Sequence, residues 1–429
     1  MTTSDDSTAH LDDPQPVVTD DAVARTPESE DPTETGRRWP RWQAWAVFAL
    51  YLAYWIHLSW PLFDDPNGIL WGAVGDQTGF LSLYRELHQD GELGILPGTV
   101  GDFAAPEGLK YGWVNLFGQA ASSLLVSGLF AVFSSLAAVA VYATIAIVGS
   151  AFAAFLLLRK LTGSPLAAVV AGFGFGFSTF LVHKSTGHLD FSHGWVFIVM
   201  LWRWLELMEH RTVRNAIFAG LGSLLAVAWT AYFALLALVL GLVLAAAFIL
   251  RELRARKFAG VRRSLVLIAV TGVAPVLFIA ASLYFAGNDP EAVIQPTRSL
   301  DELTVYAARP LDYLMPTQGT PFVGSWAQEW RANHMHGSNA SENTLYVGWT
   351  VLLLALVGII TLLRDRPKRY LGFLAVAIAL VAAWFSFPPL VGVGGVLIPT
   401  PSKFLFEVQP GFRVYSRFVV LVILALAVL

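Results

Sequence analysis

The chain contains no cysteine in its 429 residues, and only 14% of its residues are charged. The lack of cysteine excludes disulfide bonds and excludes thiolate metal or redox sites. Soluble domains carry about 25% charged residues, so the charged fraction is low. The net charge of −3 leaves no basic surface for nucleic acid. These absences exclude a soluble enzyme and a nucleic-acid-binding protein.

Hydrophobic residues make up 55% of the chain, and aromatic residues are abundant, with 15 Trp, 12 Tyr and 29 Phe. A membrane-spanning helix needs about 20 mostly apolar residues. The sequence therefore predicts an all-α polytopic protein of the cell membrane with about ten spans. The predicted spans cover 42–61, 136–158, 165–183, 193–208, 215–230, 232–250, 265–286, 345–363, 370–387 and 414–429.

The first forty residues differ from the rest of the chain. They carry ten Asp and Glu, many Ser, Thr and Pro, and almost no aromatic residues. Such a segment buries too little apolar surface to offset its conformational entropy. We therefore predict a disordered acidic cytoplasmic tail over 1–40, followed by one transmembrane domain over 41–429. The last apolar run is short and ends without a basic residue, so we expect the chain to be truncated at its C-terminus.

The apolar stretch 113–133 contains several Ser, Asn and Gln residues, and the basic residues decide its role. If it does not cross, the later basic clusters at 159–160, 211–214, 251–263 and 364–369 share one side with the Arg residues at 37–41. If it crosses, those clusters are translocated, against the bias of Lys and Arg toward the cytoplasm. We therefore predict a re-entrant or interfacial helix, a cytoplasmic N-terminus, and long outer loops carrying interfacial helices. The outer segments are then 62–135, 184–192, 287–344 and 388–413.

The first outer segment contains an acidic residue next to an amphipathic pattern. Gly75-Asp76-Gln77 is followed by 78–89, in which Phe80, Leu81, Tyr84 and Leu87 share one helical face. Such a helix lies in the membrane interface. Asp76 is then either the cap of this helix or a reactive carboxylate at the outer face, and the sequence leaves both readings open.

Several short motifs resemble the GT-C superfamily of integral-membrane glycosyltransferases, most closely its bacterial YfhO-like group. These motifs are the first span followed by GD and an amphipathic helix, the Pro-Glu-Gly at 106–108, the segment 172–192, and Pro-Gly-Phe-Arg-Val-Tyr-Ser-Arg at 410–417. The resemblance covers about 42–429. It implies a GT-C-like transmembrane helical bundle that moves a sugar from a polyprenyl-phosphate donor to a glycan, lipid or protein acceptor. It also implies an inverting enzyme that acts among membrane lipids.

The resemblance implies that Asp76 is the catalytic base, with Asp102 in reserve, because the family carries an acid early in the first outer loop. The chain departs from the family in having Gln77 where many members have a second acid. A leaving phosphate requires cations, and the best-placed candidates are Arg413, Arg417, Lys184 and His188. Arg413 and Arg417 are one helical turn apart, so their side chains could point the same way. They would then either bind the phosphate oxygens together or anchor the helix at the membrane interface.

Further candidates lie in the other outer segments. Asp190 lies two residues after His188, and the sequence allows a hydrogen bond between them. This pair would belong either to the donor site or to the structural support of the fold. His334 and His336 form a His-x-His pair to which Glu329 or Glu342 would have to add a third ligand for a metal. Because the sequence supplies no convincing third ligand, it supports no metal cofactor. The aromatic residues of 287–344 suit either sugar stacking or an interfacial belt.

Two other functions compete with the transferase. A transporter or flippase of a lipid-linked substrate needs charged residues within the spans or repeated broken helices, and the predicted spans carry few ionisable residues. A non-catalytic envelope-assembly protein would retain the same scaffold without the reaction.

Overall fold

The computed structural model describes residues 42–72, 76–91, 98–100, 109–111, 113–288, 298–320, 322–335 and 342–429. The predicted tail 1–40, Asp102 and His336 lie outside the described residues. The chain divides into two units, Met1–Gln43 and Ala44–Leu429. The second unit carries the fold and every site discussed below.

The described part is almost entirely helical, as the composition predicts. The first half contains the helices and strands α1 Trp42–Leu58, α2 Trp60–Asp64, α3 Asp76–Gln89, β1 Gly98–Val100, β2 Leu109–Tyr111, α4 Trp113–Phe130, α5 Ser135–Thr162, α6 Pro165–Gly176, α7 Thr179–Ser185, η1 Leu189–Ser192, α8 Trp195–His210 and α9 Val213–Val227. The second half contains α10 Ala231–Arg254, α11 Phe258–Asn288, α12 Leu300–Val305, α13 Pro310–Leu314, α14 Gly324–His334, α15 Trp349–Arg364, α16 Arg369–Ser386, β3 Leu390–Val393, β4 Val396–Pro399, α17 Pro401–Val408, η2 Tyr415–Phe418 and α18 Val419–Val428.

Every predicted span coincides with a helix or a broken pair of helices. Within the described residues, however, only four helices are long and apolar enough to cross a membrane, namely α5, α10, α11 and α16. The pair α6 and α7, bent by 45° at its break, makes a fifth if it is counted as one span. Others, such as α9 and α15, are apolar but shorter. The structure thus supports an all-α fold with several helices compatible with membrane insertion.

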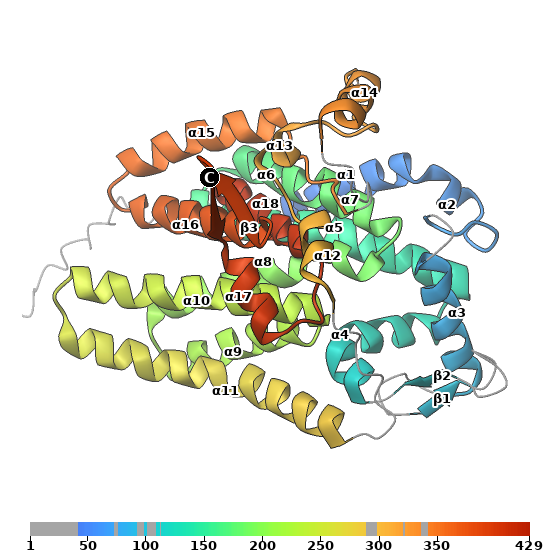
Figure 1. Ribbon diagram of the computed structural model, residues 1–429, viewed down its shortest axis with the longest axis horizontal. Coiled ribbons are helices and arrows are strands. Elements are labelled where there is room, and N and C mark those ends of the chain that lie inside the picture. The colour runs from blue at the N-terminus through green and yellow to red at the C-terminus, as the bar shows by residue number, and fades with distance from the viewer. Residues whose placement is uncertain are drawn as a thin grey trace, which may run out of the picture. The chain divides into compact units, whose positions relative to one another are not determined.

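The long helices pack around a buried centre. α18 is the most central helix, with residues 419–425 all buried, and it packs against α16, α6 and α15. α6 lies against α5 at two glycines: a Cβ on Gly172 or Gly176 would lie within 3 Å of the α5 backbone. The pairs α10 and α11, and α15 and α16, form antiparallel hairpins whose turns lie at the same end (Figure 1).

Local signals explain where the helices around the site begin and end. Ser178 accepts a hydrogen bond from the backbone N–H of Leu181 and begins α7, and Thr230 caps α10 in the same way. α5 ends at Gly163, whose φ of +72° lies in the left-handed region that glycine favours.

α4 begins and ends near the same end of the bundle. The helix is kinked at Gln119, where the backbone is not helical. Ser134, just before α5, donates a hydrogen bond to the side chain of Asn67, which follows α1 and α2. The start of α5 therefore lies near the residues that follow α1 and α2.

α3 matches the predicted amphipathic helix and begins two residues earlier. It buries Tyr84 and Leu87 from the predicted apolar face, together with Gln77. The hydroxyl groups of Tyr84 and Ser123 lie 2.7 Å apart, and this hydrogen bond ties α3 to α4. α3 and the β1–β2 hairpin lie at the end opposite the α10–α11 turn (Figure 1).

This arrangement predicts the sidedness of single-cysteine variants in native membranes. Because the chain has no cysteine, Asp90→Cys after α3 and Lys257→Cys before α11 each create a single reactive thiol. We expect an impermeant maleimide added outside the cell to label position 90 and to leave position 257 unlabelled. Labelling of both positions from one side would contradict the topology.

A buried carboxylate joins the predicted site residues

Glu342 lies at the centre of a cluster of charged side chains. Its side chain is only 4% exposed. Oε2 accepts a hydrogen bond of 2.6 Å from Lys184 Nζ, and Oε1 accepts one of 2.6 Å from Arg417 Nη2. His188 Nε2 lies 3.0 Å from the same Oε1. Three basic residues from two distant parts of the chain therefore converge on one carboxylate.

Secondary structure brings these residues together. Lys184 occupies the last turn of α7, and His188 follows in the short connection to η1. Arg417 lies in η2, directly before the buried helix α18. Glu342 lies in the segment before α15, and its backbone carbonyl accepts a hydrogen bond of 3.1 Å from the hydroxyl of Ser416. The cluster thus joins α7, η2 and the approach to α15.

Arg417 is also enclosed by aromatic rings. Its guanidinium carbon lies 3.9 Å from the ring centre of Phe191 and 4.3 Å from that of Tyr232. Such contacts stabilise a cation, most strongly where water is excluded. Since the Arg417 and Lys184 side chains are only 8% and 1% exposed, both cations serve Glu342 in this structure and do not face solvent.

Asp76 reaches the cluster through His188. Asp76 is the first residue of α3, and its side chain is 75% exposed. Its Oδ2 lies 3.2 Å from His188 Nδ1, so both ring nitrogens of His188 face carboxylates. His188 therefore lies between an exposed Asp76 and a buried Glu342.

The surrounding charges determine the ionisation of Glu342. Burial alone raises the pKa of a carboxyl group, but the hydrogen bond from His188 and the charges of Arg417 and Lys184 outweigh it, so the pKa of Glu342 lies well below its ordinary value. Glu342 is therefore ionised at neutral pH.

Arg413 does not join this cluster. Its guanidinium group lies 3.9 Å from Glu302, which Arg298 also approaches at 3.9 Å, and it lies over the ring of Tyr306. The expectation that Arg413 and Arg417 share a helical face is wrong, because residues 409–414 are not helical and place the two side chains on different partners. Arg413 remains 38% exposed.

Asp190 belongs to a neighbouring polar network. Its Oδ1 accepts a hydrogen bond of 2.5 Å from the hydroxyl of Tyr142, and its carbonyl accepts one from the indole of Trp229. The expected pair with His188 is not formed, since His188 faces Asp76 and Glu342. Burial raises the pKa of Asp190 from 3.8 to about 6, and the hydrogen bond from Tyr142 opposes this shift.

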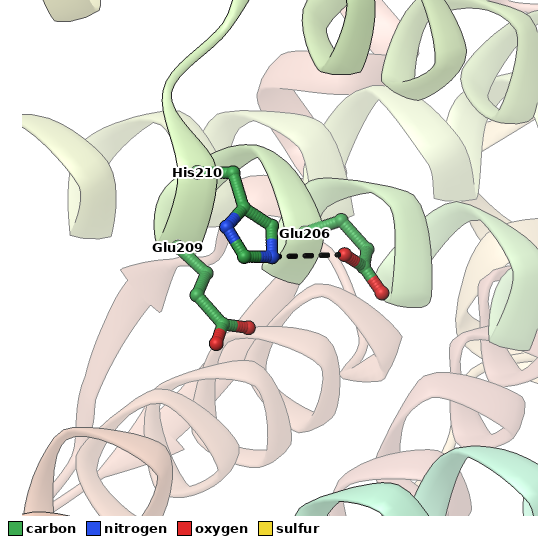
Figure 2. A group of neighbouring side chains, drawn as sticks. All are labelled: Glu206, Glu209 and His210. Carbon is green, nitrogen blue, oxygen red and sulfur yellow. Dashed lines mark ion pairs between the residues drawn. The ribbon is translucent and has the colours of Figure 1, made fainter. Parts of the chain in front are cut away.

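The metal site considered from the sequence gains no ligand from Glu342, whose two oxygens bind Lys184, His188 and Arg417. His334 is exposed, stacks on Trp330, and its Nδ1 lies 3.0 Å from the Trp330 carbonyl. Within the described residues, one other group of side chains has suitable metal-ligand spacing, Glu206, Glu209 and His210 on α8 (Figure 2). There Glu206 is already paired with Lys160 and accepts a hydrogen bond from Trp202.

Sequence reasoning identified the charged members of the cluster and missed its uncharged ones. Tyr232 and Phe191 enclose Arg417, and Tyr142 holds Asp190. Each lies in or beside an apolar stretch in which an aromatic residue is unremarkable. The sequence signal that could have indicated Tyr142 is its position as a hydroxyl-bearing residue within the otherwise apolar segment 136–158.

We expect Glu342→Gln to destabilise the protein strongly. The variant leaves Lys184 and Arg417 buried without a counter-ion, and breaking a buried ion pair costs about 3–5 kcal/mol. Denaturation in mixed micelles measures the loss, with exposed Glu329→Gln on α14 as the matched control. Because the pKa of Glu342 is lowered in the fold, its stabilisation is present above about pH 4.3 and is lost as the pH falls through the folded-state pKa. Equal stability of the two variants at pH 7 would contradict this assignment.

Asp190 should give the opposite pH dependence. A carboxyl group whose pKa is raised from 3.8 to about 6 keeps its proton up to a higher pH in the folded state than in the unfolded state. Its favourable contribution is therefore complete below about pH 4 and is lost as the pH rises to about 6. We expect Asp190→Asn to flatten the change in melting temperature between pH 4 and pH 6, while exposed Asp301→Asn leaves it unchanged. If the melting temperature of Asp190→Asn changed with pH as much as that of the wild type, the raised pKa of Asp190 would be refuted.

Comparison with known proteins adds a family. Residues 124–429 match a family described as a domain of unknown function (DUF6311). Nothing among curated proteins and nothing among solved structures matches the chain. The match includes Lys184, His188, Glu342 and Arg417 and begins after Asp76. Since it covers more than half of the chain, the protein belongs to the DUF6311 family.

Proposed function

We propose that this protein is a membrane glycosyltransferase that moves a sugar from a polyprenyl-phosphate donor to an acceptor at the outer face. The observation that carries the proposal is the exposed Asp76 carboxylate, held by His188, which is in turn held by the buried Glu342. Fixed orientation of a base by a second group is typical of acid–base catalysis. The motif resemblance to GT-C enzymes supports the same reading.

The membrane arrangement in this proposal is multi-pass. About ten helical segments cross the bilayer, including the shorter apolar helices, and the N-terminus is cytoplasmic. α3 and the residues of the charge cluster then lie at the outer end. The concentration of basic residues at the α10–α11 and α15–α16 turns supports this orientation.

The reaction requires a base and a stabilised leaving group. Asp76 takes the proton from the acceptor hydroxyl as its oxygen forms a bond to the anomeric carbon of the sugar. The bond between that carbon and the phosphate oxygen breaks, inverting the configuration and releasing polyprenyl phosphate. Because Asp76 is exposed and contacts His188, it is accessible to an acceptor and remains oriented.

The cations divide between two roles. Lys184 and Arg417 are buried on Glu342 and act as positioning residues, because they fix the carboxylate that holds His188. Arg413 and His188 are the more exposed cations among the candidates, at 38% and 22%. They are better placed to meet a donor phosphate at the surface, where a charge-assisted hydrogen bond stabilises the developing negative charge.

One observation favours a transporter of a lipid-linked substrate instead. α6 and α7 form a broken helix with the buried ion pair of Lys184 and Glu342 beyond the break. Broken helices that end at charged residues occur at transporter binding sites. A transporter would move its substrate in vesicles without forming a new glycosidic bond, so product analysis separates the two functions.

The transferase proposal predicts the effect of Asp76→Asn in the full chain. The amide cannot accept the proton, so transfer should fall by about 10²–10⁴-fold. Folding should be unaffected, because residue 76 is exposed and Asn is tolerated near a helix start. The measurement is sugar transfer in membranes supplied with a panel of polyprenyl-phosphate monosaccharides, with Asp90→Asn as the control at the other end of α3. Transfer by the Asp76→Asn variant at the wild-type rate would exclude Asp76 as the base.

A further inference from the structure

A cavity of about 900 Å³ lies beside the charge cluster, on the other side of α7. His183 and Thr186 line the cavity, whereas Lys184 and His188 contact Glu342. Two neighbouring residues in the segment before α15 divide in the same way. Asn343 lines the cavity, and Glu342 lies in the charge cluster. Adjacent Cα atoms are about 3.8 Å apart, so cavity and cluster share one thin wall.

One side of the cavity is aromatic. Tyr54 and Leu58 come from α1, and Phe173 and Phe177 come from α6 and its end. The rings of Tyr54, Phe173 and Phe177 contact one another with centres 4.9–5.0 Å apart. Tyr54 and Phe173 are 38% and 39% exposed. This face offers flat apolar surface to a ligand at the outer end of the helices.

The other side carries neutral hydrogen-bonding groups. Five threonines, two glutamines and one asparagine line the cavity, namely Thr179, Thr186, Thr317, Thr320, Thr344, Gln318, Gln328 and Asn343. Their hydroxyl and carboxamide groups can both donate and accept hydrogen bonds.

The charges of the wall disfavour a cationic ligand. No Asp or Glu is among the described residues that line the cavity, so a cationic ligand lacks a partner. The guanidinium of Arg331 donates to the backbone carbonyls of Asn343 and Met315. These bonds commit Arg331 to holding the wall together. A ligand with apolar faces, several hydroxyl donors and no charge matches the whole surface.

We propose that this cavity binds a neutral oligosaccharide. The pairing of an aromatic face with amide and hydroxyl groups suits the two kinds of surface on a sugar ring. The volume lies within the range of sites for ligands of drug size, which accommodates more than one sugar ring. Sugar binding in this cavity does not rest on the proposed transferase.

The test measures binding of neutral linear trisaccharides of glucose, mannose and galactose to the full chain in phosphatidylcholine nanodiscs. Saturation-transfer NMR and titration give the affinities. We expect at least one trisaccharide to bind the wild type, and Phe177→Ala to weaken it about tenfold. Phe177→Tyr keeps the ring and should bind normally, and Trp326→Ala, an exposed aromatic on α14 outside the cavity, is the control. If Phe177→Ala fails to fold, Tyr54→Leu removes a ring from the exposed side of the same wall.

A second variant separates a neutral ligand from an anionic one. Gln328 is exposed on α14 and lines the cavity, so Gln328→Glu adds a negative charge without disturbing the core. Trisaccharide binding should change by less than about twofold, whereas binding of an anion would weaken by about tenfold or more. Parallel titrations use inorganic phosphate and nanodiscs containing phosphatidylglycerol, which distinguish a free anion from a lipid headgroup.

The outcomes for the site and for the transferase are distinct. Failure of every trisaccharide to bind the wild type overturns the inference, as does anion binding that Phe177→Ala and Gln328→Glu both weaken. Asp76→Asn should bind the trisaccharide as the wild type does, because it lies outside the cavity. Sugar binding without transfer from any donor would leave the site standing and refute the proposed reaction.

Discussion

The charged site of this protein is organised by the need to neutralise one buried carboxylate. An ionised side chain that is removed from water costs several kcal/mol unless opposite charges and hydrogen bonds replace the water. Glu342 obtains that replacement from Lys184, Arg417 and His188. Since these residues come from α7, from η2 and from the connection before η1, their segments must meet at one point. The charge cluster therefore fixes the positions of segments that apolar packing alone would leave free to slide.

The break between α6 and α7 makes this convergence possible. Two glycines hold α6 close to the α5 backbone, and Ser178 then begins a new helix at 45° to the first. A straight helix would carry Lys184 further along the α6 axis. The bend instead directs its last turn toward Glu342 and leaves the opposite face of α7 on the cavity.

Hydrophobic runs predicted the helices well, because each run needs only local sequence to reveal it. The site was predictable residue by residue but not as an assembly. Asp76, Lys184, His188 and Arg417 were identifiable as isolated polar residues in or beside the predicted outer segments. Glu342 could be considered only as a metal ligand, because it lies in an irregular segment with no periodicity and nothing local shows that it is buried.

The two wrong pairings have equally local causes. The pairing of Arg413 with Arg417 assumed a helix, but Pro410 and Gly411 precede a non-helical stretch, and a helix begins only at η2. The pairing of His188 with Asp190 assumed that residues two apart face the same way, whereas Asp190 points to Tyr142 and His188 faces the two carboxylates.

The cluster and the cavity wall belong to one short segment of the chain. His188 contacts both Asp76 and Glu342, and Glu342 is adjacent in the chain to Asn343, whose carbonyl accepts a hydrogen bond from Arg331. Arg331 and Asn343 line the cavity, whereas Glu342 lies in the cluster. The contacts that fix this segment therefore hold the carboxylate beside His188 and the wall of the cavity at the same time.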